Sequence, residues 1–410
     1  MSGTGHAPRC DATAAPGACA DPAADPRYAR QLAVPGVGPD GQRRLAAARV
    51  LCVGAGGLGS PAATYLAAAG VGTIGIIDDY VVELSNLHRQ PLHATPDLGR
   101  SKADSASERL RALNPHTTVI AHPVRLEAGN ALELVAGYDL VIDGADTFAT
   151  RYIVSDATTL LGIPHVWAAV LGSGGQLSVF DARRGPVYRD LFPTIPAAGS
   201  VPSCAQAGVL GTVPGILGTA LAAEALKLIL GWGEPLVGRV AVYDMRDGRW
   251  DELPLAANPQ VRRPQSAAEV GAGLAASVTA ARLREVLATA GQGAVVVDVR
   301  EPAEAAAGAI PGSVNVPLAR VLADPAAVLD LAAPGESASW EPAAGPRRPA
   351  AGDPKASAGA NGALYVHCAS GARSAMAVEA LLAAARARPR APRVFDVTGG
   401  FEAWTRTEPA

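Results

Sequence analysis

The sequence predicts an α/β protein of two domains, a Rossmann-like doubly wound domain followed by a smaller α/β domain. Short apolar runs alternate with helical patterns in both halves of the chain, which is typical of parallel sheets covered by helices. One such run leads into a glycine-rich turn and a helix. A length of 410 residues is also more than one hydrophobic core usually organises.

Composition excludes several classes of protein. The net charge of −3 gives the chain no general attraction for nucleic acid or for an anionic membrane, so we expect neither as a partner. No apolar run reaches the ~20 residues that span a bilayer. Residues 1–27 lack the apolar core of a signal peptide and are interpreted as a disordered lead, so we expect a cytoplasmic protein.

The five cysteines are scattered along the chain, and no pair has the C-x-x-C spacing of a zinc site. Cys10 and Cys19 fall in the lead, and Cys52 falls in a strand as a small core residue. Cys204 and Cys368 have polar and glycine neighbours in predicted loops. These two are therefore the candidates for sulfur chemistry.

The first domain is organised around residues 49–79. They predict an apolar strand, a turn with Gly54, Gly56 and Gly59 in the frame G-x-G-x-x-G, a helix, and a second strand that ends at Asp78. Such a turn lets main-chain N–H groups approach a phosphate, and the helix offers its positive end. A carboxylate at Asp78 can accept hydrogen bonds from ribose hydroxyls. The stretch predicts a nucleotide site but does not say which nucleotide.

The following elements alternate in the same way. We expect helices over 101–113, 129–135 and 216–230 and strands over 117–122, 139–143, 164–170, 175–181 and 238–245. Glu224 and Lys227 are spaced to pair on one face of the last helix. Because Gly54, Asp78 and Asp146 all follow strands, we expect them to converge at one edge of the sheet.

A polar and cationic cluster follows the second strand. Asn86, Arg89 and Gln90 lie in one predicted loop, and Lys102 lies on the first turn of the next helix. Arginine and lysine there suit a triphosphate, whose charge must be neutralised as the α-phosphate is attacked, and Asp146 is placed to hold Mg²⁺ between phosphates. Two alternatives stay open on these residues alone: an NAD(P)-type site, and solvated surface charge for Arg89 and Lys102.

Several stretches resemble the adenylating domain of the ubiquitin-activating superfamily, of the MoeB/ThiF type. They are YARQLAVPGVGPDGQ, VGAGGLGS, SNLHRQ, GRSKA, LNPH, DTFATRY, VPSCAQAGVLG and EALKL, and they cover residues 28–255. The resemblance implies ATP as substrate and a homodimer in which Arg30 reaches the ATP of the partner. It assigns the nucleotide to Gly57, Asp78, Asn86, Arg89, Lys102 and Asp146, and to Thr147, where the family usually has asparagine.

Members of this family usually carry two C-x-x-C pairs that bind structural zinc. At the matching places this chain has VYRD (187–190) and PQVRRP (259–264), so all four thiolates are absent and we expect no zinc. The YRD variant resembles the actinobacterial MoeZ-type subgroup, in which a sulfurtransferase domain is fused. In relatives the cysteine that matches Cys204 forms thioester or acyl-disulfide links; an inert loop cysteine is the alternative.

A second α/β domain is predicted over residues 278–410, after a linker over 256–277. We expect a helix over 280–290, strands over 294–300, 363–368 and 393–397, and a helix from the loop after Cys368 to about residue 386. Residues 332–362 are rich in Pro, Gly, Ala and Ser and predict a disordered insertion.

The loop of this domain runs from a strand end into a helix and consists of Cys368, Ala369, Ser370, Gly371, Ala372 and Arg373. It directs backbone N–H groups and the helix end at the sulfur, which would stabilise a thiolate or persulfide. It is one residue shorter than the Cys-x5-Arg loop of protein phosphatases, which suits a single sulfur atom. With VVDVREPAE, AIPGSVNVP and GGFEAW, the domain resembles a single-domain rhodanese; Ala309 replaces a familiar histidine, and Asp298 and Arg300 are interpreted as scaffold.

Together the two resemblances imply a two-step activating enzyme. The first domain would use Mg·ATP to adenylate the C-terminal Gly-Gly carboxylate of a ubiquitin-like sulfur carrier of MoaD, ThiS or CysO type, with molybdopterin synthesis as the expected pathway. Cys368, loaded as a persulfide by a donor such as a cysteine desulfurase, would then attack the acyl-adenylate, and Cys204 would assist release of the thiocarboxylate. The alternatives are an NAD-dependent oxidoreductase fused to a sulfur-sensing domain, and a non-catalytic scaffold that holds a carrier protein.

Overall fold

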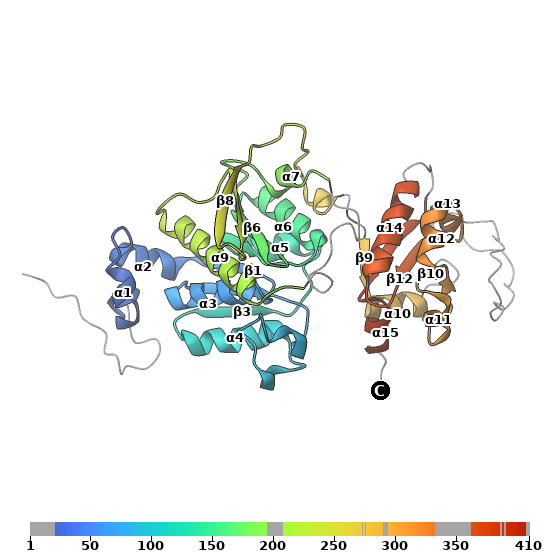
Figure 1. Ribbon diagram of the computed structural model, residues 1–410, viewed down its shortest axis with the longest axis horizontal. Helices are drawn as coiled ribbons and strands as arrows, with labels where there is room; N and C mark the ends of the chain where they lie inside the picture. Colours follow the sequence, from blue (N-terminus) through green and yellow to red (C-terminus); the bar gives the residue numbers. More distant parts are fainter. Residues whose placement is uncertain are drawn as a thin grey trace, which may run out of the picture. The chain divides into compact units, whose positions relative to one another are not determined.

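The computed structural model describes residues 21–194, 208–272, 274, 276–289, 294–332, 362–385, 388 and 391–406. It divides into two compact units, the first ending at Ala272 and the second beginning at Gly273. Both units are α/β structures (Figure 1), which confirms the predicted fold class.

The first unit is built on an eight-stranded sheet of order β3-β2-β1-β4-β5-β6-β7-β8. Its strands are β1 (Arg49–Val53), β2 (Thr73–Ile77), β3 (Thr118–His122), β4 (Leu140–Asp143), β5 (His165–Leu171), β6 (Gly174–Phe180), β7 (Arg239–Asp244) and β8 (Arg249–Pro254). Strands β1 to β5 pair in parallel, and β6 to β8 extend the sheet with antiparallel pairs. The strand order reverses between the neighbours β1 and β4, which is where doubly wound sheets bind their ligands.

Helices cover both faces of this sheet. α2, α3, α4 and α9 pack together on one face, and α5, α6 and α7 pack together on the other. The helices are α1 (Ala29–Leu32), α2 (Gly38–Ala47), α3 (Gly59–Ala69), α4 (Lys102–Leu113), α5 (Ala131–Ala136), α6 (Phe148–Leu161), α7 (Tyr188–Leu191) and α9 (Thr212–Leu230). The predicted helices and strands of this unit are therefore present, with ends that shift by a few residues.

Helix α9 is the central helix of the first unit. Among the described residues it is the one helix long and apolar enough to cross a membrane. However, half of its apolar stretch is buried inside the unit, where the helix packs against α3, β5 and β6. Glu224 and Lys227 pair on it at 2.5 Å, as predicted, and Glu224 also accepts a hydrogen bond from the Leu236 amide at 2.9 Å. These contacts are those of a core helix in a globular unit.

The predicted lead and linker are both partly structured. Residues 1–20 lie outside the described residues, but 21–27 enter two short 3₁₀ turns, η1 (Pro22–Ala24) and η2 (Pro26–Tyr28). Asp21 caps the first turn and pairs with Arg43 at 2.9 Å, so the prediction of disorder is wrong for these seven residues.

The segment 256–272, predicted as part of the linker, is attached to the first unit instead. The buried carboxylate of Asp156 accepts hydrogen bonds from the Gly271 amide at 2.8 Å and from two guanidinium nitrogens of Arg189 at 2.7 and 2.8 Å. Val270 is buried beside them. A sequence rich in Pro and Gln is held here by polar contacts that composition alone does not reveal.

A second ionic contact joins the two stretches that stand where the family has its cysteine pairs. Asp190 accepts hydrogen bonds from the amides of Val187 at 2.7 Å and Asn258 at 2.8 Å, and Arg263 lies 3.4 Å from the same carboxylate. Arg263 also donates to the carbonyl of Gly185. The two stretches are thus linked by charge; the absence of zinc stays a prediction.

The second unit has a five-stranded parallel sheet of order β11-β10-β12-β13-β9. Its strands are β9 (Ala276–Thr279), β10 (Ala294–Asp298), β11 (Val314–Asn315), β12 (Ala363–His367) and β13 (Arg393–Thr398). The helices α12 (Leu318–Ala323), α13 (Pro325–Asp330) and α14 (Ala372–Ala385) pack on one another, and α10 (Ala280–Thr289) packs on α15 (Gly400–Arg406). α11 (Pro302–Ala306) follows β10.

The predicted insertion leaves the second unit and returns at almost the same point. Residues 333–361 lie outside the described residues. A Cβ on Gly362 would lie 2.0 Å from the Ala332 carbonyl oxygen, so the two ends of the segment are in contact. The sheet therefore continues directly from Gly362 into β12, regardless of what lies between.

We expect Asp156→Asn to destabilise the first unit by about 3–5 kcal/mol, because it leaves the largely buried Arg189 guanidinium without its counter-charge. This corresponds to a fall in Tm of roughly 6–20 °C, measurable by calorimetry. Arg246→Gln, which breaks the exposed pair with Asp244, is the control and should leave the Tm nearly unchanged, because solvent screens an exposed ion pair. Equal effects of the two substitutions would contradict the role given to Asp156.

Candidate active sites

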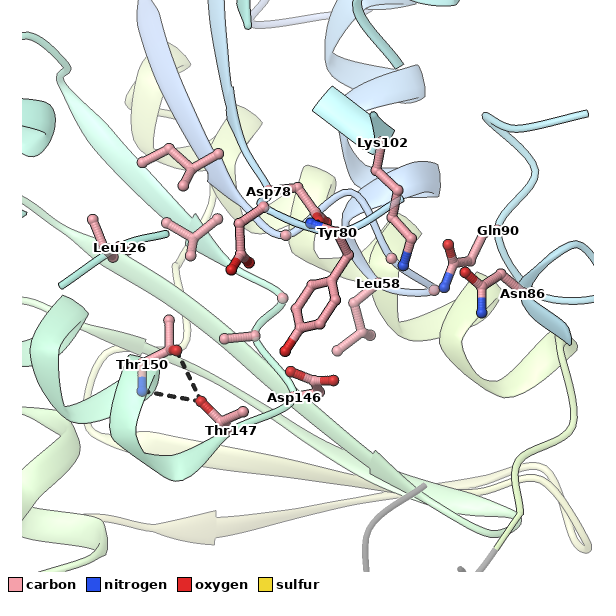
Figure 2. A pocket seen from close by; sticks show the side chains of 18 of the residues that line it. Leu58, Asp78, Tyr80, Asn86, Gln90, Lys102, Leu126, Asp146, Thr147 and Thr150 are labelled. Atoms are coloured by element: carbon pink, nitrogen blue, oxygen red, sulfur yellow. Dashed lines mark hydrogen bonds between the residues drawn. The ribbon is translucent and has the colours of Figure 1, made fainter. Parts of the chain in front are cut away.

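A pocket of about 340 Å³ opens at the carboxyl ends of β1 and β4. It gathers side chains from the turn after β1, the end of β2, the loop before α4 and the start of α6 (Figure 2). Seven of the residues predicted to bind the nucleotide line it: Gly57, Asp78, Asn86, Arg89, Lys102, Asp146 and Thr147. The expected convergence of strand ends is therefore present.

The glycine turn is shaped by one very close approach. Gly54 has a φ of +90°, in the left-handed region that favours glycine. A Cβ on Gly59 would lie 1.8 Å from the Gly54 carbonyl oxygen, so no side chain fits at the start of α3. These two glycines bring the backbone and the N-terminus of α3 to the edge of the pocket, as phosphate binding requires.

Asp78 stands at the end of β2 with both oxygens engaged. It accepts hydrogen bonds from the Ala55 amide at 2.8 Å and from the Tyr80 amide at 2.9 Å. Burial raises the pKa of Asp78, and the charge of Lys102 and the two amide bonds oppose that rise. Each oxygen keeps a further lone pair for a ribose hydroxyl.

The two cations of the pocket differ in exposure. Lys102 is only 8% exposed, with its ammonium 5.6 Å from the centre of the Tyr80 ring, so the surface-charge alternative does not hold for it. Arg89 is less buried and donates to the Ser85 carbonyl at 2.8 Å. Asn86 is buried and closes its loop by accepting from the Glu83 amide.

Asp146 projects into the pocket from a firmly held loop. The backbone N–H of Ala145 donates to Asp143 at 3.0 Å, and its carbonyl accepts from Arg151 at 3.1 and 3.0 Å, which fixes the backbone next to Asp146. His165 in turn lies 2.9 Å from Asp143. The Asp146 carboxylate is exposed and forms no hydrogen bond or ion pair within the described chain. Such an oxygen ligand fits Mg²⁺, which is usually held by one or two carboxylates together with substrate phosphates.

Thr147 is the N-cap of α6. Its hydroxyl accepts from the Thr150 amide at 3.2 Å and contacts the Thr150 hydroxyl at 2.8 Å (Figure 2). Threonine thus takes a capping role at the position where the family usually has asparagine.

The structure does not test the predictions for two residues. Arg30 is exposed on α1 and does not line the pocket of its own chain. Cys204 lies outside the described residues. Neither assignment is tested, and both stay predictions.

Sequence reasoning missed several lining residues, among them Tyr80, Arg125, Thr150 and Arg151. Arg125 lies 3.8 Å from Asp79 at the pocket edge. Arg151 falls within the motif DTFATRY, so its position in that stretch was an available signal. Tyr80 directly follows two acids and carried no pattern of its own.

A buried histidine ties the glycine turn to helix α4. The ring nitrogens of His93 lie 3.0 Å from the Ala55 carbonyl oxygen and 3.0 Å from the Ser105 hydroxyl. A carbonyl only accepts, so Nε2 carries the proton and Nδ1 accepts from the hydroxyl. Burial is the main cause that lowers the pKa of His93, which keeps the ring neutral.

The second unit holds the cysteine loop between β12 and α14. Cys368 is almost fully buried, and its sulfur accepts a hydrogen bond from the Gly371 amide at 3.0 Å. The carbonyls of Cys368 and Ala369 accept from the amides of Phe401 and Glu402 at 2.8 and 3.0 Å. The loop is therefore fixed against α15 with its sulfur facing a backbone N–H, as the sequence predicts.

Arg373 completes the loop as half of an ion pair. It donates two hydrogen bonds of 2.6 Å to Glu304. This contact lowers the pKa of Glu304 to about 2, and it raises the pKa of Arg373 together with a smaller contribution from Cys368. Arg373 thus lies close to the sulfur, while its charge is balanced by Glu304.

The ion pair of Asp298 and Arg300 lies beside Phe401, the residue whose amide binds the Cys368 carbonyl. Both side chains are buried and joined by hydrogen bonds down to 2.6 Å, and Arg300 also donates to the Gly308 carbonyl. The Arg300 guanidinium lies 4.2 Å from the centre of the Phe401 ring. These contacts are those of a scaffold, as the sequence analysis expects.

The geometry defines a class: an α/β nucleotide-binding domain joined to a domain with a buried, backbone-stabilised cysteine. Comparison with known proteins gives the family. The model of the ThiF family matches residues 28–263, and that of the rhodanese-like domain matches residues 279–407. The chain therefore belongs to the ThiF family and carries a rhodanese-like domain after it, which confirms both resemblances.

Relatives extend over most of the chain. The Sulfur carrier protein adenylyltransferase of Thermus thermophilus is 51% identical over 57% of this chain and 88% of its own length. The Probable adenylyltransferase/sulfurtransferase MoeZ of Mycobacterium tuberculosis is 45% identical over 68% of this chain and 75% of its own. The Adenylyltransferase and sulfurtransferase uba4 of Emericella nidulans is 37% identical over 92% and 84%. The chain is an enzyme of this adenylyltransferase and sulfurtransferase class.

Among solved structures, the crystal structure of E. coli MccB with MccA-N7isoASN is similar with a TM-score of 0.52. The match has 20% identity and covers 58% of this chain and 73% of the other. This likeness shows the shared fold of the first unit alone.

We expect Gly59→Ala to abolish nucleotide binding in calorimetric titration, because the new methyl group would collide with the Gly54 carbonyl and push the turn open. Gly129→Ala is the matched control, since a Cβ there meets nothing within 4 Å. Circular dichroism would show whether each variant is folded. Tight nucleotide binding by a folded Gly59→Ala protein would contradict the account of the turn.

The stability of the first unit should fall with acid because of His93. Its pKa is lowered in the folded state, so the unfolded state binds the proton more readily, and stability is lost as the pH falls through the unfolded value of about 6.5. Urea unfolding at pH 7.5 and 5 should show a smaller acid loss in His93→Gln, whose side chain does not titrate. Identical losses in the two proteins would rule this contribution out.

Proposed function

We propose that this chain activates a ubiquitin-like sulfur carrier in two steps. It adenylates the C-terminal Gly-Gly carboxylate of the carrier with ATP, and it then transfers sulfur from a persulfide on Cys368 to give a thiocarboxylate. One observation carries the first step: a glycine turn, an uncompensated buried lysine and an exposed carboxylate line a single pocket. The relatives named as sulfur carrier adenylyltransferase and sulfurtransferase support the assignment.

The first step needs no base, because the carrier carboxylate is already ionised at neutral pH. A carboxylate oxygen attacks the α-phosphorus, the bond from the α-phosphorus to the bridging oxygen breaks, and pyrophosphate leaves. Lys102 and Arg89 balance the charge that develops on the phosphates, and the turn holds them in place through its amides. Asp146 would hold Mg²⁺, which supplies further charge neutralisation between phosphate oxygens.

The second step uses the loop of the second unit. A sulfur donor, such as the persulfide of a cysteine desulfurase, passes its outer sulfur to the Cys368 thiolate and leaves as a thiolate. The terminal sulfur of the Cys368 persulfide attacks the acyl carbon, and AMP leaves. A thiol, for which Cys204 is the candidate, then attacks the Cys368 sulfur; the S–S bond breaks, the thiocarboxylate leaves, and an external dithiol reduces the protein disulfide that remains.

The remaining parts of the proposal concern assembly and pathway. Arg30 is exposed and away from the pocket of its own chain, which fits a role in the site of a second copy in a homodimer. We assign the carrier to molybdopterin synthesis, on the resemblance to the MoeZ type. The cytoplasm stays the expected location, as the sequence predicts.

ATP–pyrophosphate exchange with each available Gly-Gly-ending carrier tests the first step. We expect exchange that depends on the carrier, and Lys102→Ala should lower its kcat/KM by about 10²- to 10³-fold because it removes a charge contact to the reacting phosphates. Arg246→Gln, far from the pocket lining, is the control. No exchange with any such carrier would overturn the proposal.

The same assay separates the two steps. Cys368→Ser should keep the exchange, since Cys368 does not line the pocket, and should form no thiocarboxylate in a mass-spectrometric assay of the carrier. Thiocarboxylate formation at the normal rate by this variant would remove Cys368 from the mechanism.

A further inference from the structure

Tyr80 stands at the pocket between the two groups assigned to the triphosphate. It lines the pocket together with Lys102 and Asp146, and it is 51% exposed. Figure 2 shows its ring between the two side chains, with the hydroxyl directed toward the Asp146 carboxylate. Nothing in the motifs quoted above gives this tyrosine a role.

Hydrogen bonds hold the backbone of Tyr80, while its side chain is half-exposed. Its amide donates to Asp78 at 2.9 Å, and its carbonyl accepts from the Lys102 amide at 2.9 Å. The neighbouring Val81 forms a bridge with Ser101. The Cα position is therefore fixed to the same strand end and helix start that carry Asp78 and Lys102.

The Lys102 ammonium lies over the Tyr80 ring, 5.6 Å from the ring centre. Lys102 is buried and forms no side-chain hydrogen bond or ion pair within the described chain. An ammonium over an aromatic face is stabilised electrostatically, more so when water is partly excluded. The ring thus takes over some of the stabilisation that water or a counter-charge would supply.

The hydroxyl end of the Tyr80 side chain faces a negative charge, that of Asp146. The phenol is a hydrogen-bond donor, and its O–H is directed toward the Asp146 carboxylate (Figure 2). Asp146 has no hydrogen bond or ion pair to a described residue. One side chain therefore separates a lysine and an aspartate that would otherwise attract each other across the pocket.

We infer that Tyr80 is a positioning residue, whose ring keeps Lys102 directed into the pocket and apart from Asp146 so that both meet the phosphates of an incoming nucleotide. The inference rests on the proposed function, because it takes ATP as the ligand of this pocket. Removing the ring frees Lys102 to turn toward Asp146 or Asp78 and weakens nucleotide binding. Removing only the hydroxyl keeps the aromatic face.

The test is a calorimetric titration of the full chain with ATP, with and without Mg²⁺ and without carrier. Tyr80→Ala should weaken ATP binding by about two- to five-fold, the effect of one exposed cation–π contact. Tyr80→Phe should recover most of this loss. Tyr65→Ala removes a similarly exposed tyrosine from α3, away from the pocket lining, and should bind ATP as the natural chain does.

A double-mutant cycle with Lys102→Gln shows whether Tyr80 acts on ATP binding through Lys102 or only through the local structure. Once Lys102 is uncharged, the ring has no cation to hold, so Tyr80→Ala should weaken binding no further. Equal binding by Tyr80→Ala and the natural chain, or an equal loss in both Lys102 backgrounds, would overturn the inference. These outcomes are distinct from a failure of the proposed function, in which the natural chain binds ATP but shows no carrier-dependent exchange.

Discussion

Ala55, through its backbone N–H and C=O, is the residue on which the nucleotide pocket depends. Its amide donates to Asp78 at the end of β2, and its carbonyl accepts from His93, which also contacts Ser105 of α4. One residue of the glycine turn is thereby fixed to the end of β2 and, through His93, to helix α4. The buried carboxylate and the buried ring both carry a desolvation cost, which these hydrogen bonds offset. The shape of the turn is therefore set by its neighbours as much as by its glycines.

The sequence predicted those pocket residues whose place follows from a strand end or from the glycine turn. Asp78 directly follows β2 and Asp146 lies in the loop after β4, and the carboxyl ends of parallel strands meet at one edge of the sheet. His93, Arg151 and Tyr80 were missed because their roles come from contacts between segments that are distant in sequence or that carry no regular spacing. The same reason explains the misassigned linker, since the groups that hold 256–272 lie on α6 and α7.

A charged contact joins the stretches around Asp190 and Arg263, where the sequence predicts no zinc. Asp190 accepts from two amides as well as from a guanidinium, so its oxygens are satisfied within the protein. A buried charge is costly when its partner is missing, so Asp190 depends on the amides and on Arg263 together.

The cations of the two candidate sites differ in ion pairing. Lys102 is buried without a counter-ion pair, which leaves its charge available for a polyanionic substrate. Arg373 is bound to Glu304 through two short hydrogen bonds, so the sulfur of Cys368 faces a balanced ion pair and a single backbone amide. A polyphosphate brings several negative charges and needs an uncompensated cation, while a thiolate or persulfide brings one. The difference in pairing thus matches the difference in charge between the phosphate chemistry of the first unit and the sulfur chemistry of the second.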